Sequence, residues 1–126
     1  MADSIGEFAL NHTGNVYVKN DEGVVVGYVN YEGTATGYGT VMGTMSFPLP
    51  ESGATSGTCS WTAQGFPPDS AWTTSSGDGT WEQIEGRYAW KISLPVIEIS
   101  NGTRIRTEGE LDLEAKTLTG QMFEIS

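Results

Sequence analysis

The chain has little of what most metal and redox sites require. It contains one cysteine, Cys59, and one histidine, His12, among 126 residues. A single cysteine excludes a disulfide within the chain. These two residues are also too few for the nitrogen and sulfur ligand sets of zinc, and the carboxylates lack the spacing of a calcium-binding loop. We therefore expect no metal, no cofactor and a reducing, cytoplasmic location.

Positive charge is also scarce. Six lysines and arginines stand against sixteen aspartates and glutamates, which gives a net charge of −10. This balance disfavours nucleic acids and anionic membranes as partners, and no basic cluster offsets it. No apolar run approaches the roughly 18 residues of a membrane-spanning helix, and the N-terminus lacks the basic and then apolar order of a secretion signal. We expect a charge that serves solubility, with no nucleic-acid or membrane partner.

Short runs rich in threonine, valine, tyrosine, tryptophan and isoleucine alternate with clusters of glycine, asparagine, proline and serine. This pattern is typical of an all-β sandwich or barrel, and no stretch has a helical period. The predicted strands cover residues 7–19 with a bend at Gly14, and then 24–31, 37–47, 57–64, 71–83, 87–99, 104–113 and 118–125. Because every connection is short, each strand should pair with its sequence neighbour. Pairing of the first strand with the last would remove both open edges. We predict one domain, residues 1–126, that forms a closed eight-stranded antiparallel up-and-down barrel with almost no helix.

The stretch from Gly77 to Ile92 is predicted to organise the fold, as a hairpin turned at Glu85-Gly86. Whatever lies inside the barrel should contact a tryptophan of this hairpin. Further along the chain, Pro95 predicts either a bulge or an edge strand. Asn101-Gly102 is the strongest hairpin signal and predicts a two-residue type I′ turn.

Alternation predicts which side chains face inward. Charged residues of strand 104–113 share one face, which should be exposed to water. The inward faces of two other strands are predicted to hold Cys59, Trp61 and Ala63, and Tyr88, Trp90, Ile92 and Leu94. Alternation does not decide the faces of strands 24–31 and 37–47. In strand 71–83 either Trp81 or Glu82 points inward.

An interior of this kind either packs solid with its own rings or surrounds one small ligand. Apolar walls with a few hydroxyl groups suit a flat or polycyclic organic molecule. The candidate ligand-binding residues are Tyr28, Tyr38, Met42, Cys59, Trp61, Trp72, Tyr88 and Trp90.

The candidate acid–base groups are His12, Asp78 and Glu82. His12 could titrate near neutrality, although a single histidine at a bend is more often solvated or a capping residue. The two carboxyl groups would have raised pKa values and could move protons if their face were internal. They are ordinary surface acids if Trp81 points inward, and the surface alternative is favoured. Cys59 is expected to be a packed thiol rather than a nucleophile, since no basic neighbour would stabilise a thiolate.

Three stretches, residues 39–47, 77–82 and 108–113, resemble the small bacterial barrels grouped with allene oxide cyclase and dirigent proteins. The likeness covers the strand layout of most of the chain and rests on glycine-rich motifs. It implies a hydrophobic small molecule held in the barrel and, in some members, a cyclisation or isomerisation that needs no cofactor because the protein holds a reactive conformer. It also implies that the chain could form homo-oligomers. No catalytic residue of the family aligns with this chain.

Three functional hypotheses follow. The first is a cofactor-free isomerase, cyclase or lyase that uses His12, Asp78 or Glu82 to transfer a proton. The second is a lipocalin-like carrier with the same cavity and no chemistry. The third is a solid barrel that acts as an interaction or structural protein through loops such as residues 66–70.

Overall fold

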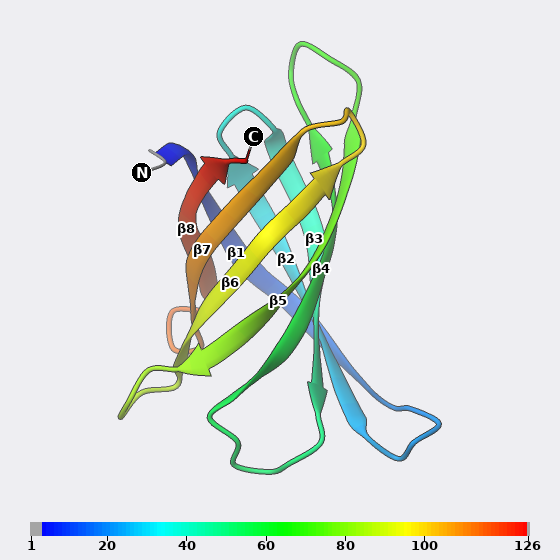
Figure 1. Cartoon of the computed structure of the whole chain (residues 1–126), viewed down its shortest axis with the longest axis vertical. Helices are drawn as coiled ribbons and strands as arrows, with labels where there is room; N and C mark the ends of the chain where they lie inside the picture. The colour runs from blue at the N-terminus through cyan, green and yellow to red at the C-terminus, as the bar shows by residue number, and fades with distance from the viewer. Residues whose placement is uncertain (1–3, 126) are drawn as a thin grey trace.

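The computed structural model describes residues 4–125, and in it all strands form one closed antiparallel barrel (Figure 1). The predicted eight-stranded up-and-down barrel is confirmed. Its strands follow one another around the barrel in chain order. They are β1 (Ser4–Lys19), β2 (Val25–Ala35), β3 (Gly39–Leu49), β4 (Ser56–Phe66), β5 (Thr73–Gln83), β6 (Ala89–Ile99), β7 (Arg104–Asp112) and β8 (Thr117–Glu124). The described residues include no helix long and apolar enough to cross a membrane.

The barrel closes where the first strand meets the last. β1 pairs with β2 from Phe8 to Lys19 and with β8 over its first half, where Leu10 lies opposite Leu118. The backbone N–H of His12 continues this ladder by donating to the carbonyl oxygen of Lys116, with an N···O distance of 2.9 Å. Closure covers the edge of β1 from Ser4 to Asn11, whereas the rest of that strand pairs with β2 alone.

The bend predicted at Gly14 and the irregularity predicted at Pro95 are present. The register of β1 shifts between His12 and Gly14, and that of β6 shifts around Pro95. In β5 the register with β6 shifts between Ser76 and Thr80. A Cβ atom at Gly79 would lie 2.0 Å from the carbonyl oxygen of Ser93. Glycine is therefore required where these two backbones approach most closely.

The predicted type I′ turn at Asn101-Gly102 is wrong. The N–H of Gly102 donates to the carbonyl oxygen of Ile99, and Gly102 alone has positive φ, at 92°. A type I′ turn would need positive φ at Asn101 as well. The connection is instead a three-residue loop in which Gly102 occupies the left-handed position. Asn101 uses its side-chain oxygen to accept from the N–H of Thr103, at 2.9 Å.

Large rings lie across glycines on the inner wall. At these glycines a Cβ atom would come within 2.5 to 3.0 Å of the ring of an aromatic residue. The pairs are Trp61 over Gly43, Trp81 over Gly57, Phe8 over Gly109 and Gly120, and Tyr17 over Gly27. Since glycine leaves the strand surface bare, the ring covers the exposed backbone of the neighbouring strand. Contact with a large ring therefore explains why glycine occupies these five positions.

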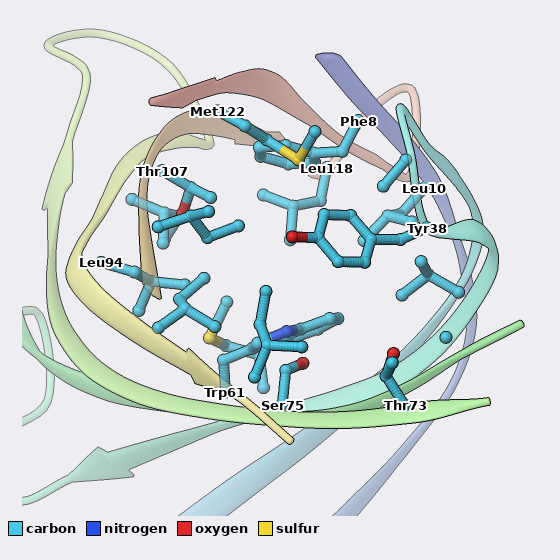
Figure 2. Close-up of a pocket in the computed structure, with 18 residues that line it drawn as sticks. Phe8, Leu10, Tyr38, Trp61, Thr73, Ser75, Leu94, Thr107, Leu118 and Met122 are labelled. Carbon is cyan, nitrogen blue, oxygen red and sulfur yellow. The ribbon is translucent and has the colours of Figure 1, made fainter. Parts of the chain in front are cut away.

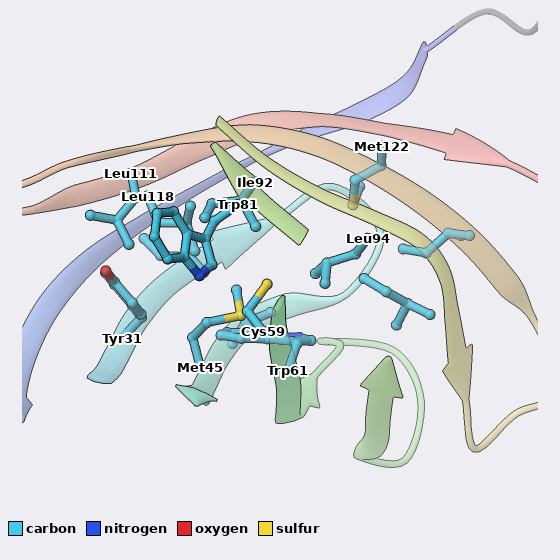
Figure 3. Close-up of a cluster of buried hydrophobic side chains, with 14 of the residues drawn as sticks. Tyr31, Met45, Cys59, Trp61, Trp81, Ile92, Leu94, Leu111, Leu118 and Met122 are labelled. Carbon is cyan, nitrogen blue, oxygen red and sulfur yellow. The ribbon is translucent and has the colours of Figure 1, made fainter. Parts of the chain in front are cut away.

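The middle of the barrel is filled by a layer of buried side chains that we call the core belt (Figure 3). Its members are Tyr31, Met45, Cys59, Trp61 and Trp81, none of which is more than 8% exposed. The indole N–H of Trp81 is buried there and has no acceptor among the described residues. Trp81 therefore points inward, which is one of the two alternatives predicted for strand 71–83.

Candidate functional site

The barrel is hollow on both sides of the core belt. The Tyr38 cavity lies toward the β2–β3, β4–β5 and β6–β7 connections, and the His12 cavity lies toward the other four turns. The two cavities share no lining residue. The interior is thus neither one continuous hollow nor a solid core.

The Tyr38 cavity is small and apolar, with a volume of about 80 Å³. Tyr38 lies in the turn between β2 and β3, and its ring reaches across the cavity (Figure 2). Burial raises the pKa of this phenol above its ordinary value. The hydroxyl-bearing side chains on the wall are Thr73, Ser75 and Thr107. An engineered apolar cavity of about 150 Å³ holds one benzene molecule, so a space of about 80 Å³ is too small for a polycyclic molecule.

The His12 cavity is larger, with a volume of about 370 Å³. This volume falls within the range of about 300–1,000 Å³ that is usual for small-molecule sites. Its apolar wall includes Val29, Phe47, Leu49, Trp81, Trp90, Leu111 and Leu113. Trp81 and Trp90 come from the two strands of the β5–β6 hairpin, and they supply the indole rings of the cavity wall.

One side of the His12 cavity is polar and belongs to β1. The side-chain oxygen of Asn15 accepts a hydrogen bond from Nε2 of His12. Because an amide oxygen can only accept, Nε2 carries the proton and Nδ1 of the neutral ring is an acceptor. The amide nitrogen of Asn15 donates to the hydroxyl oxygen of Tyr17, at 3.0 Å. The hydroxyl proton of Tyr17 therefore stays available to a ligand.

Tyr31 joins this polar side to the core belt. Its ring meets that of His12 edge to face, with centroids 6.1 Å apart and an interplanar angle of 69°. Burial raises the pKa of the Tyr31 phenol well above its ordinary value. A neutral hydroxyl at this depth can donate a hydrogen bond to a ligand oxygen at any physiological pH.

The charged groups of the cavity stand at its mouth, in and beside the β7–β8 turn. Asp112 pairs with Arg87 at 3.3 Å, and it accepts a hydrogen bond from the backbone N–H of Ala115 at 3.1 Å. Lys116, the last residue of the turn, also lines the cavity and forms no salt bridge with the described residues.

Four of the predicted site residues line a cavity. His12 and Trp90 lie in the His12 cavity, and Tyr38 and Trp61 lie in the Tyr38 cavity. Cys59 sits between them in the core belt, 2% exposed. Burial, and secondarily the charge of Asp78, raises the pKa of this thiol to about 11. The expectation of a packed thiol agrees with this environment.

Four other predicted ligand-binding residues are exposed and line neither cavity, so their placement inside the barrel is wrong. Tyr28 and Met42 are 37% and 44% exposed, because β2 and β3 turn their odd-numbered residues inward. Trp72 lies in the β4–β5 connection and is 61% exposed. Tyr88 precedes the first residue of β6 and is 72% exposed, so the alternation of that strand does not reach it.

Asp78 and Glu82 also lie on the outer surface of β5, as the favoured surface alternative required. The Asp78 carboxylate accepts a hydrogen bond from the hydroxyl group of Ser60 on β4, at 2.7 Å. Glu82 is exposed beside the inward-pointing Trp81. Neither carboxylate can reach a molecule inside the barrel, so their prediction as internal acid–base groups is wrong.

Sequence reasoning missed Asn15, Tyr17 and Lys116. The bulge after His12 adds one residue to β1, which brings Asn15 and Tyr17 onto the same inner face as His12. The predicted bend at Gly14 was a usable signal for this change of face. The pattern of residues gives no signal that Lys116 lines the cavity, because its position depends on the conformation of the β7–β8 turn.

Residues 4–125 hold no group of three or more side chains that could bind a metal ion. Comparison of the chain with models of protein families, with curated proteins and with solved structures found no match.

Proposed function

We propose that this protein binds a flat, apolar small molecule in the His12 cavity and acts as its carrier. The observation that carries this proposal is the cavity of about 370 Å³, with aromatic walls and polar groups confined to one side. Sites for small organic ligands have this composition. A carrier is favoured over an enzyme because Asp78 and Glu82 lie outside the barrel.

The expected ligand has two or three fused rings. A bicyclic ring that buries about 250 Å² gains about 6 kcal/mol at 25 cal/mol per Å². Part of this gain offsets the lost freedom of the ligand, so a dissociation constant in the micromolar range or weaker is expected for the apolar part alone. Edge-to-face contacts with Trp81 and Trp90 favour flat rings over flexible chains.

The test is a fluorescence titration with N-phenyl-1-naphthylamine, a neutral aromatic probe that emits strongly in apolar surroundings. Val29 lines the cavity, so Val29→Phe should fill part of it and weaken binding at least about tenfold. Val16→Phe is the matched control, because Val16 is 54% exposed and lines neither cavity. Equal binding by wild type and Val29→Phe would show that the probe does not bind in the His12 cavity.

A cofactor-free isomerase, cyclase or lyase is the second candidate, and one observation favours it. His12 is a proton acceptor at Nδ1 and lies in the cavity that would hold a substrate. Mass spectrometry of small molecules that co-purify with wild type and with His12→Gln separates the two candidates. A carrier retains the same compound in both proteins, whereas an enzyme accumulates an isomeric or unreacted compound in the variant.

A further inference from the structure

One lysine, Lys116, lines the His12 cavity, although the protein as a whole carries a net charge of −10. Its charged lining residues are Asp112 and Lys116. The carboxylate of Asp112 is occupied by Arg87 at 3.3 Å and by the N–H of Ala115 at 3.1 Å. Arg87 also lies 3.9 Å from Glu110 on the outer face of β7, so both charges of the Arg87–Asp112 pair have partners. Lys116 is the remaining charged residue of the lining and forms no salt bridge with the described residues.

The backbone of Lys116 is held in an unusual conformation. Its φ is 58°, and no other non-glycine residue among those described has a positive φ. This left-handed region is uncommon for lysine, whereas glycine and asparagine enter it readily. The carbonyl oxygen of Lys116 accepts from the N–H of His12, which ties the turn to β1. The fold thus places a lysine beside the polar wall at a position where asparagine or glycine would fit with less strain.

The polar wall also determines which groups can bind an anion. Nε2 of His12 already donates to Asn15, so the neutral ring has no second proton to offer. Tyr17 accepts from Asn15 and keeps its own hydroxyl proton. A hydroxyl donor, Tyr17, and a cation, Lys116, are therefore available in the same lining as the indole rings of Trp81 and Trp90.

Resting on the proposed function, we propose that the ligand is an aromatic or polycyclic acid. Its rings lie against Trp81 and Trp90, and its carboxylate lies at the mouth, where it pairs with Lys116 and accepts a hydrogen bond from Tyr17. The charge-assisted contact selects the acid over a neutral compound of the same shape. Glu114 belongs to the same turn but does not line the cavity, so it does not neutralise Lys116 from within.

The test compares 2-naphthoate with 2-naphthamide, which have the same rings and differ in charge. Calorimetric titration at pH 8 and low salt should show about tenfold tighter binding of the acid by wild type. Lys116→Asn should abolish this preference, so that the acid and the amide bind with equal affinity. Asparagine tolerates the backbone conformation at this position, so the variant should fold.

Lys19→Asn is the matched control. Lys19 ends β1 at the same end of the barrel, and its replacement changes the net charge equally without touching the cavity lining. This variant should keep the preference for the acid. Added salt should reduce the preference in wild type and have little effect in Lys116→Asn.

The outcomes separate this inference from the proposed function. Equal binding of acid and amide by wild type would overturn the acid inference and leave the cavity as a neutral site. A preference for the acid that persists in Lys116→Asn would also overturn the acid inference, since a group other than Lys116 would then bind the carboxylate. Binding of neither compound would overturn the inference together with the proposed function.

Discussion

The pairing of rings with glycines makes a sharp prediction for Gly43→Ala. An added Cβ atom would lie 2.5 Å from Cη2 and 2.6 Å from Cζ2 of Trp61, and 2.7 Å from Cβ of Ala63. Carbon atoms separated by less than about 3.5 Å repel one another. Trp61 is only 7% exposed, so its ring cannot swing into solvent. The substitution must push the ring into the Tyr38 cavity or spread β3 from β4.

The magnitude follows from two opposing effects. Alanine in a strand interior is favoured over glycine by roughly 0.5–1 kcal/mol. Overpacking a well-filled interior costs about 1–3 kcal/mol. The Tyr38 cavity gives the ring some room, which places the packing cost in the middle of that range. We expect Gly43→Ala to lower the free energy of unfolding by about 1 kcal/mol.

The assay is urea unfolding monitored by tryptophan fluorescence. At a slope of about 2 kcal/mol per molar, the midpoint should fall by roughly 0.5 M. Gly14→Ala is the matched control, because nothing lies within 4 Å of its added Cβ atom and its φ is not positive. This variant should raise the midpoint by a few tenths molar, since alanine restricts the unfolded chain more than glycine does. If both variants shifted the midpoint in the same direction, the account of Trp61 packed on Gly43 would be refuted.

Two further predictions concern ionisable groups in the interior. Cys59 has a pKa of about 11 against an ordinary 9.0, so at pH 8 iodoacetamide should alkylate it at least about 100-fold more slowly in the folded protein than in urea. Alkylation at equal rates would contradict its burial. The raised pKa values of Cys59, Tyr31 and Tyr38 mean that the folded protein holds these protons more tightly than the unfolded chain does. Stability is therefore complete below the unfolded pKa, near 9 for the thiol, and is lost as the pH rises toward and through 11. Urea midpoints should be level between pH 7 and about pH 8.5 and lower at pH 10, and a midpoint that rose at pH 10 would contradict this sign.

The fold could be predicted from the sequence because strand identity is a local property. Runs of β-branched and aromatic residues between glycine and proline breaks identify each strand, and short connections leave neighbours little choice but to pair. Bends at Gly14 and Pro95 were visible for the same reason. The type of turn at Asn101-Gly102 is harder to predict, since a type I′ turn and a three-residue loop with a glycine bulge use the same dipeptide.

The site was less predictable because the face of a residue depends on register. The alternation in residues 24–31 and 37–47 fits either face, and a shift of one position moves Tyr28 or Met42 from the inner to the outer face together with its whole strand. Residues outside the strands, such as Trp72 and Tyr88, follow no alternation. The interior is divided into two cavities where large rings cross the barrel. The positions of these rings depend on glycines of neighbouring strands, such as Gly43 beneath Trp61.

Methyl NMR of the protein titrated with 2-naphthamide is the most direct test of the central claim, which is that the His12 cavity is the binding site. The methyl signals of Val29 and Leu111, which line that cavity, should shift in proportion to occupancy. Those of Ile97 and Met122, which line the Tyr38 cavity on the far side of the core belt, should remain in place. Shifts confined to Ile97 and Met122, or shifts in neither set at saturating ligand, would contradict the account.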